Sequence, residues 1–201
     1  MPIDLFEAIY SQRAIRRFRS EPVPEELIYK ILDAAIRAPS AANRQPWRFL
    51  VVTDRTLKEQ VASLYKRSWD EVYGGPSSGT TLSVGIRSSA THLAEYMADV
   101  PVLIIACIGH DGSSSNLARG SSIYPAIQNL MLAARGLDLG TVITTLHKRY
   151  EAEVKGIFGI PEDVETAALI PVGYLAEDEH FGGSRRVSVK DVTYHNKWGI
   201  A

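Results

Sequence analysis

A polar turn between two prolines constrains this chain more than any other feature. Residues 38–49 read Ala-Pro-Ser-Ala-Ala-Asn-Arg-Gln-Pro-Trp-Arg-Phe and join a clear helix to a clear strand. Proline fixes its own φ and disfavours a helical conformation at the residue before it, so the helix has to stop here. Ser40 suits a capping turn. Asn43 and Gln45 together are not explained by such a turn, and their planar amides carry the donors and acceptors to read the edge of a heterocycle.

Hydrophobic periodicity, helix caps and breaker residues predict the elements along the rest of the chain. The expected helices cover residues 5–12, 24–38, 54–73, 87–98, 123–135 and 151–158, with Asp4 and Asp54 as caps and Gly136 ending the fifth helix. The expected strands cover residues 47–53, 102–108, 141–145 and 166–172. Helices come first and strands then mix with helices, which predicts an α+β fold with a sheet of about four strands.

Two features indicate that part of the core belongs to a dimer. The helix at residues 123–135 is apolar over much of its circumference. The polar tail from Ala176 ends in Tyr194 and Trp198, which need a surface to pack on. Apolar faces of this kind are usually covered by another subunit when the chain itself offers no cover.

Basic residues gather at two places that suit a phosphate group. Arg13 and Arg16 stand at the end of the first helix, where a spacing of three puts them on one face, with Arg17 pointing elsewhere. Guanidinium forks grip phosphate in a bidentate manner. A solvated basic face is the commoner meaning of such a cluster, and this pair by itself favours that interpretation. Arg185 and Arg186 in the tail are either solvated charge or a second arm on the same phosphate.

The composition is that of one ordinary globular domain. The 201 residues are 45% hydrophobic and 22% charged, with a formal net charge of -1, which argues against nucleic-acid binding. The single cysteine, Cys107, lies in an apolar run and is expected to be a buried small hydrophobe rather than a nucleophile. The sequence shows no apolar leader and no membrane-spanning segment, so the predicted location is the cytoplasm and no membrane partner is expected.

The sequence offers no protein group that would perform chemistry unaided. The five histidines lack metal-ligand spacing, so no metal site is predicted. It contains no nucleophile elbow, zinc-protease motif or phosphate-binding loop. Gly136 and Gly140 follow a helix and do not form a dinucleotide fingerprint; a helix end with a tight turn explains them, although Gly140 leaves room for a flat ligand. An enzyme built from this chain is expected to rely on a cofactor.

The residues quoted so far resemble the nitroreductase family of flavoproteins, nearly from end to end. The matching segments are residues 13–18, the turn at 38–47, the helix at 122–130, the turn at 136–145 and residues 184–186. The proline-serine-asparagine-glutamine-proline-tryptophan turn is the specific part, and the other segments support it by their order. The resemblance implies a three-layer fold, with a central, mostly antiparallel sheet flanked by helices, in an intertwined homodimer.

The resemblance also implies a site for FMN at the dimer interface. Arg13 and Arg16 would hold the phosphate and ribityl end, together with Arg185 or Arg186. The turn residues would line the flavin, commonly from the opposite subunit, and Thr144 and Thr145 would lie near its reactive edge. Arg16 or a backbone amide would offset the negative charge of the reduced ring. The full set of expected FMN contacts is Gln12, Arg13, Ala14, Arg16, Pro39, Ser40, Asn43, Gln45, Val142, Thr144, Thr145, Arg185 and Arg186.

Two departures from the family pattern bear on the site. Gln12-Arg13-Ala14 stands where the family usually has Arg-Arg-Ser, so a guanidinium and a hydroxyl are missing and moderate FMN affinity is expected. Residues 69–87 fall in a variable region and are interpreted as a mobile substrate lid with Trp69 and Tyr73, or alternatively as a surface loop. Residues 176–201 are expected to form an arm that wraps the partner subunit.

The resemblance implies a two-step reaction. NADH or NADPH reduces FMN by hydride transfer and leaves, and an electron-poor acceptor such as a nitroaromatic or a quinone then enters the same place. Two alternatives stay open. One is another flavoenzyme of the same scaffold, such as a dehalogenase, a flavin-cleaving enzyme or a ring dehydrogenase. The other is a flavin-binding protein without enzymatic activity.

Overall fold

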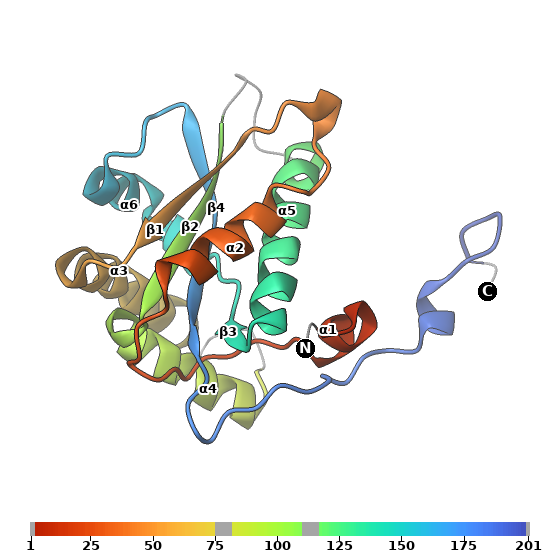
Figure 1. Cartoon of the computed structure of the whole chain (residues 1–201), viewed down its shortest axis with the longest axis horizontal. Coiled ribbons are helices and arrows are strands. Elements are labelled where there is room, and N and C mark those ends of the chain that lie inside the picture. Colours follow the sequence, from red (N-terminus) through yellow and green to blue (C-terminus); the bar gives the residue numbers. More distant parts are fainter. Residues whose placement is uncertain (1–2, 75–81, 110–116, 200–201) are drawn as a thin grey trace.

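Four antiparallel strands form the centre of the structure (Figure 1), a computed structural model that describes residues 3–74, 82–109 and 117–199. The order across the sheet is β1-β2-β4-β3, and every pairing is antiparallel. The predicted α+β fold with a sheet of about four strands is therefore confirmed. The strands are β1 Trp47–Val52, β2 Val102–Gly109, β3 Leu139–Thr141 and β4 Val164–Tyr174.

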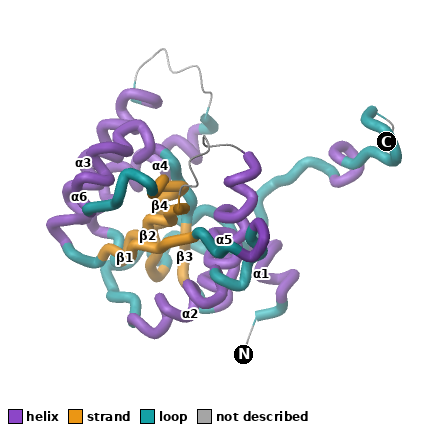
Figure 2. Tube along the Cα trace, turned by 90° about the horizontal axis from the view of Figure 1, so that it is seen from above, coloured by secondary structure: helices purple, strands orange, loops and turns teal. Residues whose placement is uncertain are grey.

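Helices cover both faces of this sheet, as the two perpendicular views in Figures 1 and 2 show. Helices α2 and α5 pack on one face, and α3, α4 and α6 pack on the other. The α-helices are α1 Leu5–Ser11, α2 Glu25–Ala35, α3 Arg55–Tyr73, α4 Val84–Tyr96, α5 Leu117–Gly136 and α6 Glu151–Phe158. Short 3-10 turns are η1 Ala41–Asn43, η2 Met97–Asp99, η3 Leu146–Tyr150 and η4 Val189–Val192.

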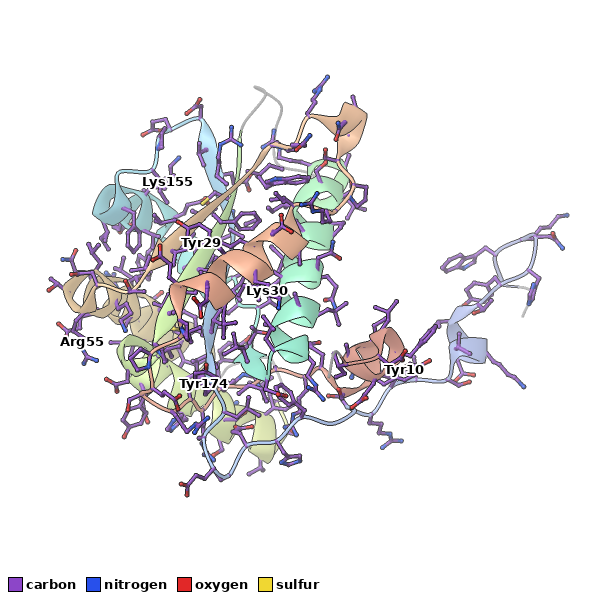
Figure 3. All side chains as sticks on the ribbon, in the orientation of Figure 1. Tyr10, Tyr29, Lys30, Arg55, Lys155 and Tyr174 are labelled. Atoms are coloured by element: carbon purple, nitrogen blue, oxygen red, sulfur yellow. The ribbon has the colours of Figure 1, made fainter. Side chains whose placement is uncertain are left out.

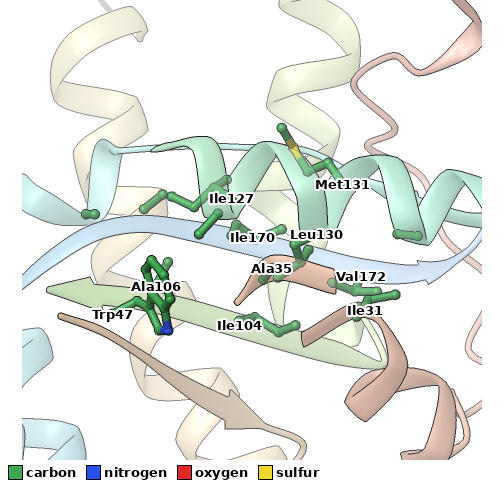
Figure 4. Packing of buried hydrophobic residues seen from close by; sticks show 14 of the residues in the cluster. Ile31, Ala35, Trp47, Ile104, Ala106, Ile127, Leu130, Met131, Ile170 and Val172 are labelled. Atoms are coloured by element: carbon green, nitrogen blue, oxygen red, sulfur yellow. The ribbon is translucent and has the colours of Figure 1, made fainter. Parts of the chain in front are cut away.

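Strand β2 shows why the core has two halves. It is apolar at nearly every position, as expected of a strand buried on both faces. Its alternate residues point to opposite sides: Ile104 and Ala106 pack under α2 and α5 (Figure 4), and Leu103 and Ile105 pack under α3 and α4. Side chains along β2 therefore alternate between the layer of α2 and α5 and the layer of α3, α4 and α6.

Local sequence signals account for the helix boundaries. The Asp4 carboxylate accepts the Phe6 N–H at 2.9 Å, and the Asp54 carboxylate accepts the Leu57 N–H at 2.9 Å, so both predicted caps are confirmed. Helices α3 and α6 end at the predicted residues. Helix α5 ends at Gly136 as predicted, but it begins at Leu117, six residues earlier than expected.

The segment after α1 departs from the prediction. Residues 13–18 are extended rather than helical, because their backbone finds partners on the sheet: Ile15 N–H donates to Thr141 O at 2.9 Å, and Phe18 bridges Leu175. The argument that Arg13 and Arg16 share a helix face is therefore wrong. Arg17 forms an ion pair with Asp178 at 2.8 Å, which keeps it away from any shared phosphate.

Strand β3 is shorter than predicted and sets the position of the chain that follows it. The expected strand 141–145 ends at Thr141, and Thr144 returns to the sheet only through a bridge to Leu169. The left-handed conformation that often follows a helix end is taken by Asp138, with φ of 57°, rather than by Gly136. A Cβ on Gly140 would lie 2.7 Å from Ile15 Cγ2, so this glycine admits Ile15 and not a flat ligand.

The C-terminal arm leaves the body of the molecule beyond α1 (Figure 1). All residues from Gly183 to Gly199 are exposed. Its root is attached, because Gly182 N–H donates to Ser11 O at 2.8 Å and the Arg135 guanidinium lies 4.1 Å from the Phe181 ring centroid. Over the ranges that the structure describes, no helix combines the length and the apolar character needed to cross a membrane.

Candidate functional site

Six of the residues expected at the site meet in one cleft of about 250 Å³ between α3, α4 and the chain after β3. We call it the Arg16 cleft. The six are Arg16, Trp69, Tyr73, Val142, Thr144 and Thr145. Apolar residues of α3 and α4 complete its walls. A wider hollow of about 750 Å³ over α6 is lined by none of the expected residues, so it is not a competing site.

Among the residues that the structure describes, Arg16 is the only charged side chain that lines the cleft. It is half-buried, and burial lowers the pKa of its guanidinium, with Tyr65 and Glu179 acting in the opposite direction. One of its nitrogens lies 3.4 Å from the Ser89 hydroxyl, whose own proton goes to Ile86 O. Within residues 3–74, 82–109 and 117–199, no carboxylate forms an ion pair with Arg16. A half-buried cation that no described carboxylate contacts directly suits an anionic or electron-rich ligand.

Thr144 is held rigidly at the floor of the cleft. Its N–H donates to Leu169 O at 3.0 Å and its carbonyl accepts the Leu169 N–H at 2.9 Å, so this peptide is tied to the buried centre of the sheet. The Thr144 N–H is therefore not available to a ligand. The N–H of Thr145 makes no hydrogen bond within the described structure, so it is a backbone donor left for a ligand at this point.

Tyr65 is a cleft residue that the sequence interpretation missed. Its phenol oxygen lies 3.1 Å from Thr144 Oγ1, and the side chain is only 3% exposed. The sequence placed Tyr65 on the apolar face of the helix at 54–73, and a polar tip on such a face was the signal that it would find a partner. Only the fold shows that the partner is a threonine 79 residues further along the chain.

The two aromatic residues assigned to a lid belong to helix α3. Trp69 is 5% exposed and packs in the core, with its ring centroid 4.5 Å from that of Tyr73. A side chain buried in this way is a fixed wall, so its assignment to a mobile lid is wrong. Residues 84–87 of the expected lid form the start of α4. Residues 75–81 lie outside the described residues.

The expected phosphate ligands are only partly assembled. Gln12 caps α1, with its N–H donating to Ala8 O at 3.0 Å, and Arg13 lies near enough for its charge to act on Arg16. The attached root of the arm passes α1 at Ser11, directly before this segment. Arg185 and Arg186 follow three and four residues later on the exposed part of the arm, and neither lines the Arg16 cleft. Ala14 bridges Thr141.

The proline-bounded turn lies at the opposite end of the sheet from the cleft. It precedes Trp47, which pairs with Ile108 at the end of β2, whereas β3 pairs with the far end of β4. The turn is strained, because Ala42, Asn43 and Gln45 have φ of 50°, 53° and 51°. Such strain is concentrated at functional sites.

Polar contacts inside the turn leave its amides facing outward. Ser40 precedes η1 without a side-chain cap hydrogen bond, and its Oγ instead accepts the Gln45 N–H at 3.0 Å and closes the turn. The Gln45 side chain donates to Asn43 Oδ1 at 3.2 Å, and both residues are exposed. Pro39 is exposed as well. Within one chain the turn does not reach the Arg16 cleft, so a joint role for the two needs a second subunit.

Neither a thiol nor a metal centre competes with this site. Cys107 is buried, and burial raises the pKa of its thiol to about 11, which confirms that it is a small core residue. Trp47 is also in the core, as expected. Among the residues that the structure describes, no group of three or more His, Cys, Asp or Glu side chains could hold a metal ion.

Comparison with known proteins gives one consistent family. The model of the Nitroreductase family matches residues 9–174. A protein of Methanothermobacter thermautotrophicus with the provisional name NADH dehydrogenase/NAD(P)H nitroreductase is 36% identical over 98% of this chain and 88% of its own length. An iodotyrosine deiodinase of Thermotoga neapolitana is 30% identical over 85% of this chain and 88% of its own length.

A solved structure agrees with the sequence relatives. The crystal structure of an oxidized iodotyrosine deiodinase bound to FMN and 3-iodo-L-tyrosine superposes with a TM-score of 0.75 at 26% identity. The match covers 92% of this chain and 97% of that chain. The fold, with its helices on both faces of the sheet, is thus the fold of an FMN-binding relative.

Proposed function

Since the chain belongs to the nitroreductase family, we propose that it is an FMN-dependent oxidoreductase that takes electrons from NADH or NADPH. The acceptor would be an electron-poor small molecule such as a nitroaromatic or a quinone. The observation that carries the proposal is the Arg16 cleft, where a half-buried cation that no described carboxylate contacts directly shares the lining with two threonines and apolar side chains. Among the described residues, no acid–base pair of side chains lines this cleft, which suits chemistry carried by a cofactor.

The residues present suit FMN. When bound, FMN would supply the redox chemistry, taking a hydride from the nicotinamide and passing two electrons to the acceptor. Arg16 offers a positive charge to the electron-rich edge of the ring, and the Thr145 N–H offers a backbone donor. Trp69 and Tyr73 form an aromatic wall that keeps water from the ring. Arg13, with Arg185 or Arg186, would hold the phosphate.

A homodimer completes the site in this proposal. A cavity of about 250 Å³ is smaller than the roughly 300–1,000 Å³ of ordinary cofactor sites. The strained turn with Pro39, Ser40, Asn43 and Gln45 would be contributed by the partner subunit. Exposed apolar side chains support association: Leu5 and Phe6 on α1 are 62% and 60% exposed, and Trp198 on the arm is 88% exposed.

Reductive dehalogenation is the second candidate, because two of the compared proteins are iodotyrosine deiodinases. The cleft argues against an amino-acid substrate. An α-ammonium group needs an acceptor, preferably a carboxylate, and Arg16 is the one charged residue among the described residues of the lining. By sequence, residues 72–86 add no charged side chain either. A neutral or anionic acceptor fits this cleft better than a zwitterion.

The first experiment is an anaerobic titration of the FMN-loaded protein with NADH and with NADPH, followed by absorbance. We expect the flavin band near 450 nm to bleach and to return when a quinone or a nitroaromatic is added. A loaded protein that bleaches only with dithionite would contradict the NAD(P)H reductase. Adding 3-iodo-L-tyrosine to the reduced protein distinguishes the second candidate function from the first. In a deiodinase the flavin would be reoxidised and iodide would be released.

A further inference from the structure

Two hydroxyl groups meet inside the Arg16 cleft, and the function proposed so far says nothing of the hydrogen bond between them. The Tyr65 phenol comes from the middle of α3, and the Thr144 hydroxyl comes from the chain after β3. Their oxygens lie 3.1 Å apart. This is the only hydrogen bond that the Tyr65 side chain makes in the described part of the chain. A contact between two separate elements at the floor of a cleft is positioned by the whole fold.

The backbone at Thr144 leaves its hydroxyl very little freedom. Both polar groups of its peptide are bonded to Leu169, which is completely buried. The branched Cβ of threonine restricts the side-chain torsion further. The Leu146 N–H, at 3.5 Å from Thr144 Oγ1, approaches the same oxygen from the next turn. With the oxygen located by these contacts, what remains open is the direction in which the hydroxyl proton points.

The charge of Arg16 determines which hydroxyl donates. Tyr65 and Arg16 line the same cleft, and the Arg16 charge lies near enough to the phenol to oppose the rise in its pKa that burial causes. A nearby cation attracts the lone pairs of the phenol oxygen and repels its proton, so the O–H turns away from Arg16 and toward Thr144. Burial raises the pKa of the Tyr65 phenol, so it keeps its proton at neutral pH. In the opposite arrangement the buried phenol proton would have no acceptor.

We propose that Tyr65 is a positioning residue that makes Thr144 a hydrogen-bond donor to the ligand of the cleft. With Thr144 Oγ1 accepting from the phenol, the threonine's own proton is free to point into the cavity. The cleft then presents three donors, namely the Thr144 hydroxyl, the Thr145 N–H and the Arg16 guanidinium. Its complement is a flat heterocycle that turns an edge of nitrogen and oxygen acceptors toward them. The inference rests on the proposed function only in taking FMN as that heterocycle.

The test is a double-mutant cycle on FMN affinity with Tyr65→Phe, Thr144→Val and the double variant. The probe is FMN itself, and quenching of its fluorescence by the protein gives the dissociation constant without any turnover. Loss of one neutral hydrogen bond predicts a dissociation constant about three- to tenfold higher for Tyr65→Phe. Since Tyr65 acts through Thr144, the double variant should bind within about twofold of Thr144→Val alone.

A purely structural role for Tyr65 gives different results. If the phenol only stabilises the fold, the effects of the two substitutions add and the bound flavin spectrum stays the same. The matched control is Tyr29→Phe, which removes a phenol that is 64% exposed on α2 (Figure 3) and should leave FMN binding unchanged. Wild-type protein that binds no FMN would overturn the proposed function and this inference together. Wild-type binding with an unchanged Tyr65→Phe constant, or with additive effects, overturns this inference alone.

Discussion

Arg16 is the residue on which the proposed site depends most. A half-buried charge is costly to desolvate and is normally compensated by a counterion. Its nearest polar partner in the described structure is the Ser89 hydroxyl at 3.4 Å, a long and neutral contact. Most of the N–H donors of the Arg16 guanidinium are therefore left for a ligand. Arg17, one residue away, is already paired with Asp178.

Replacing Arg16 is expected to weaken FMN binding strongly. Loss of a charge-assisted hydrogen bond, about 1.5–3 kcal/mol, predicts a roughly 10- to 100-fold higher dissociation constant for Arg16→Ala. Equilibrium titration of FMN against the unloaded protein measures it. Arg17→Ala removes the same charge from the same segment and should change the constant very little. If Arg16→Ala and Arg17→Ala raised the FMN dissociation constant equally, FMN binding would depend on the net charge of the segment and not on the position of Arg16.

His147 is buried beneath the cleft in a network of polar side chains. The Thr166 hydroxyl donates to Glu151 Oε1 at 2.7 Å, so at 3.1 Å it can only accept from His147 Nε2. Nδ1 is then unprotonated, and it has no partner in the described structure. Burial lowers the pKa of the imidazole to about 4, well below the roughly 6.5 of an unfolded chain.

This shift predicts that acid destabilises the fold. Between pH 6.5 and pH 4 the unfolded chain binds a proton at His147 that the folded chain does not, so stability falls as the pH falls. From pH 7 to pH 5 the loss is about 2 kcal/mol. Urea unfolding at both pH values measures it. His147→Gln should remove most of this difference, while His195→Gln, on the exposed arm, should keep it. An unchanged difference in His147→Gln would assign the acid sensitivity to other groups.

At the scale of elements, the contact between β3 and the extended segment after α1 brings Arg16 to the cleft. Ile15 is completely buried, and its N–H bonds to Thr141 O. Gly140 makes this approach possible, since an added Cβ would lie 2.7 Å and 2.9 Å from Ile15 Cγ2 and Cβ. The added Cβ would clash with a branched side chain of the core close to its own backbone. Moving that side chain or its backbone away would cost free energy.

Gly140→Ala should therefore destabilise the protein. Overpacking of a tight core contact predicts a loss of about 1–3 kcal/mol in the free energy of unfolding. Chemical denaturation gives the value, and FMN affinity should fall with it because Arg16 follows Ile15. Gly156→Ala is the matched control: nothing lies within 4 Å of its added Cβ in α6, so alanine there should be neutral or stabilising. Similar losses in both variants would rule out the Ile15 contact as the cause.

At the scale of the whole molecule, one chain leaves two apolar surfaces without cover. The exposed face of α1 carries Leu5, Phe6, Ile9 and Tyr10, and the arm carries Val187, Val189, Val192, Tyr194 and Trp198. Within its described residues, the arm has no core of its own beyond the contact between the tilted rings of Tyr194 and Trp198, whose centroids lie 4.6 Å apart. An extended, apolar arm with an attached root is typical of a segment that packs on a partner.

Deletion of residues 184–201 is expected to yield a monomer with little bound FMN. The cut leaves the root intact, because Phe181 and Gly182 keep their contacts with Arg135 and Ser11. The loss would then report on the arm and not on the fold of the body. Sedimentation velocity of the full chain and of the truncated chain at the same concentration measures whether each is a monomer or a dimer. A truncated protein that sediments as a dimer would contradict a partner-wrapping arm.

Much of the site and of the fold was readable from residue patterns. Asp4, Asp54 and the prolines act through their immediate neighbours, so the helix ends they mark were predicted within a residue or a few. Thr144 and Thr145, which were named from the family resemblance, line the Arg16 cleft. Cys107 is a core residue, as its apolar surroundings indicated. The extended course of residues 13–18 and the early end of β3 were missed, because both depend on partners that are distant in sequence.

The sequence by itself determined the alternation of buried and exposed residues, the caps and the strained turn, since these follow from side-chain chemistry over a few neighbouring positions. The tertiary structure alone decided that Ile15 lies against Gly140, that Trp69 is a wall of α3, and that the Tyr65 phenol meets Thr144. Contacts between residues that are far apart in the sequence depend on how the sheet and its helices pack together. Local propensity carries no information about that packing.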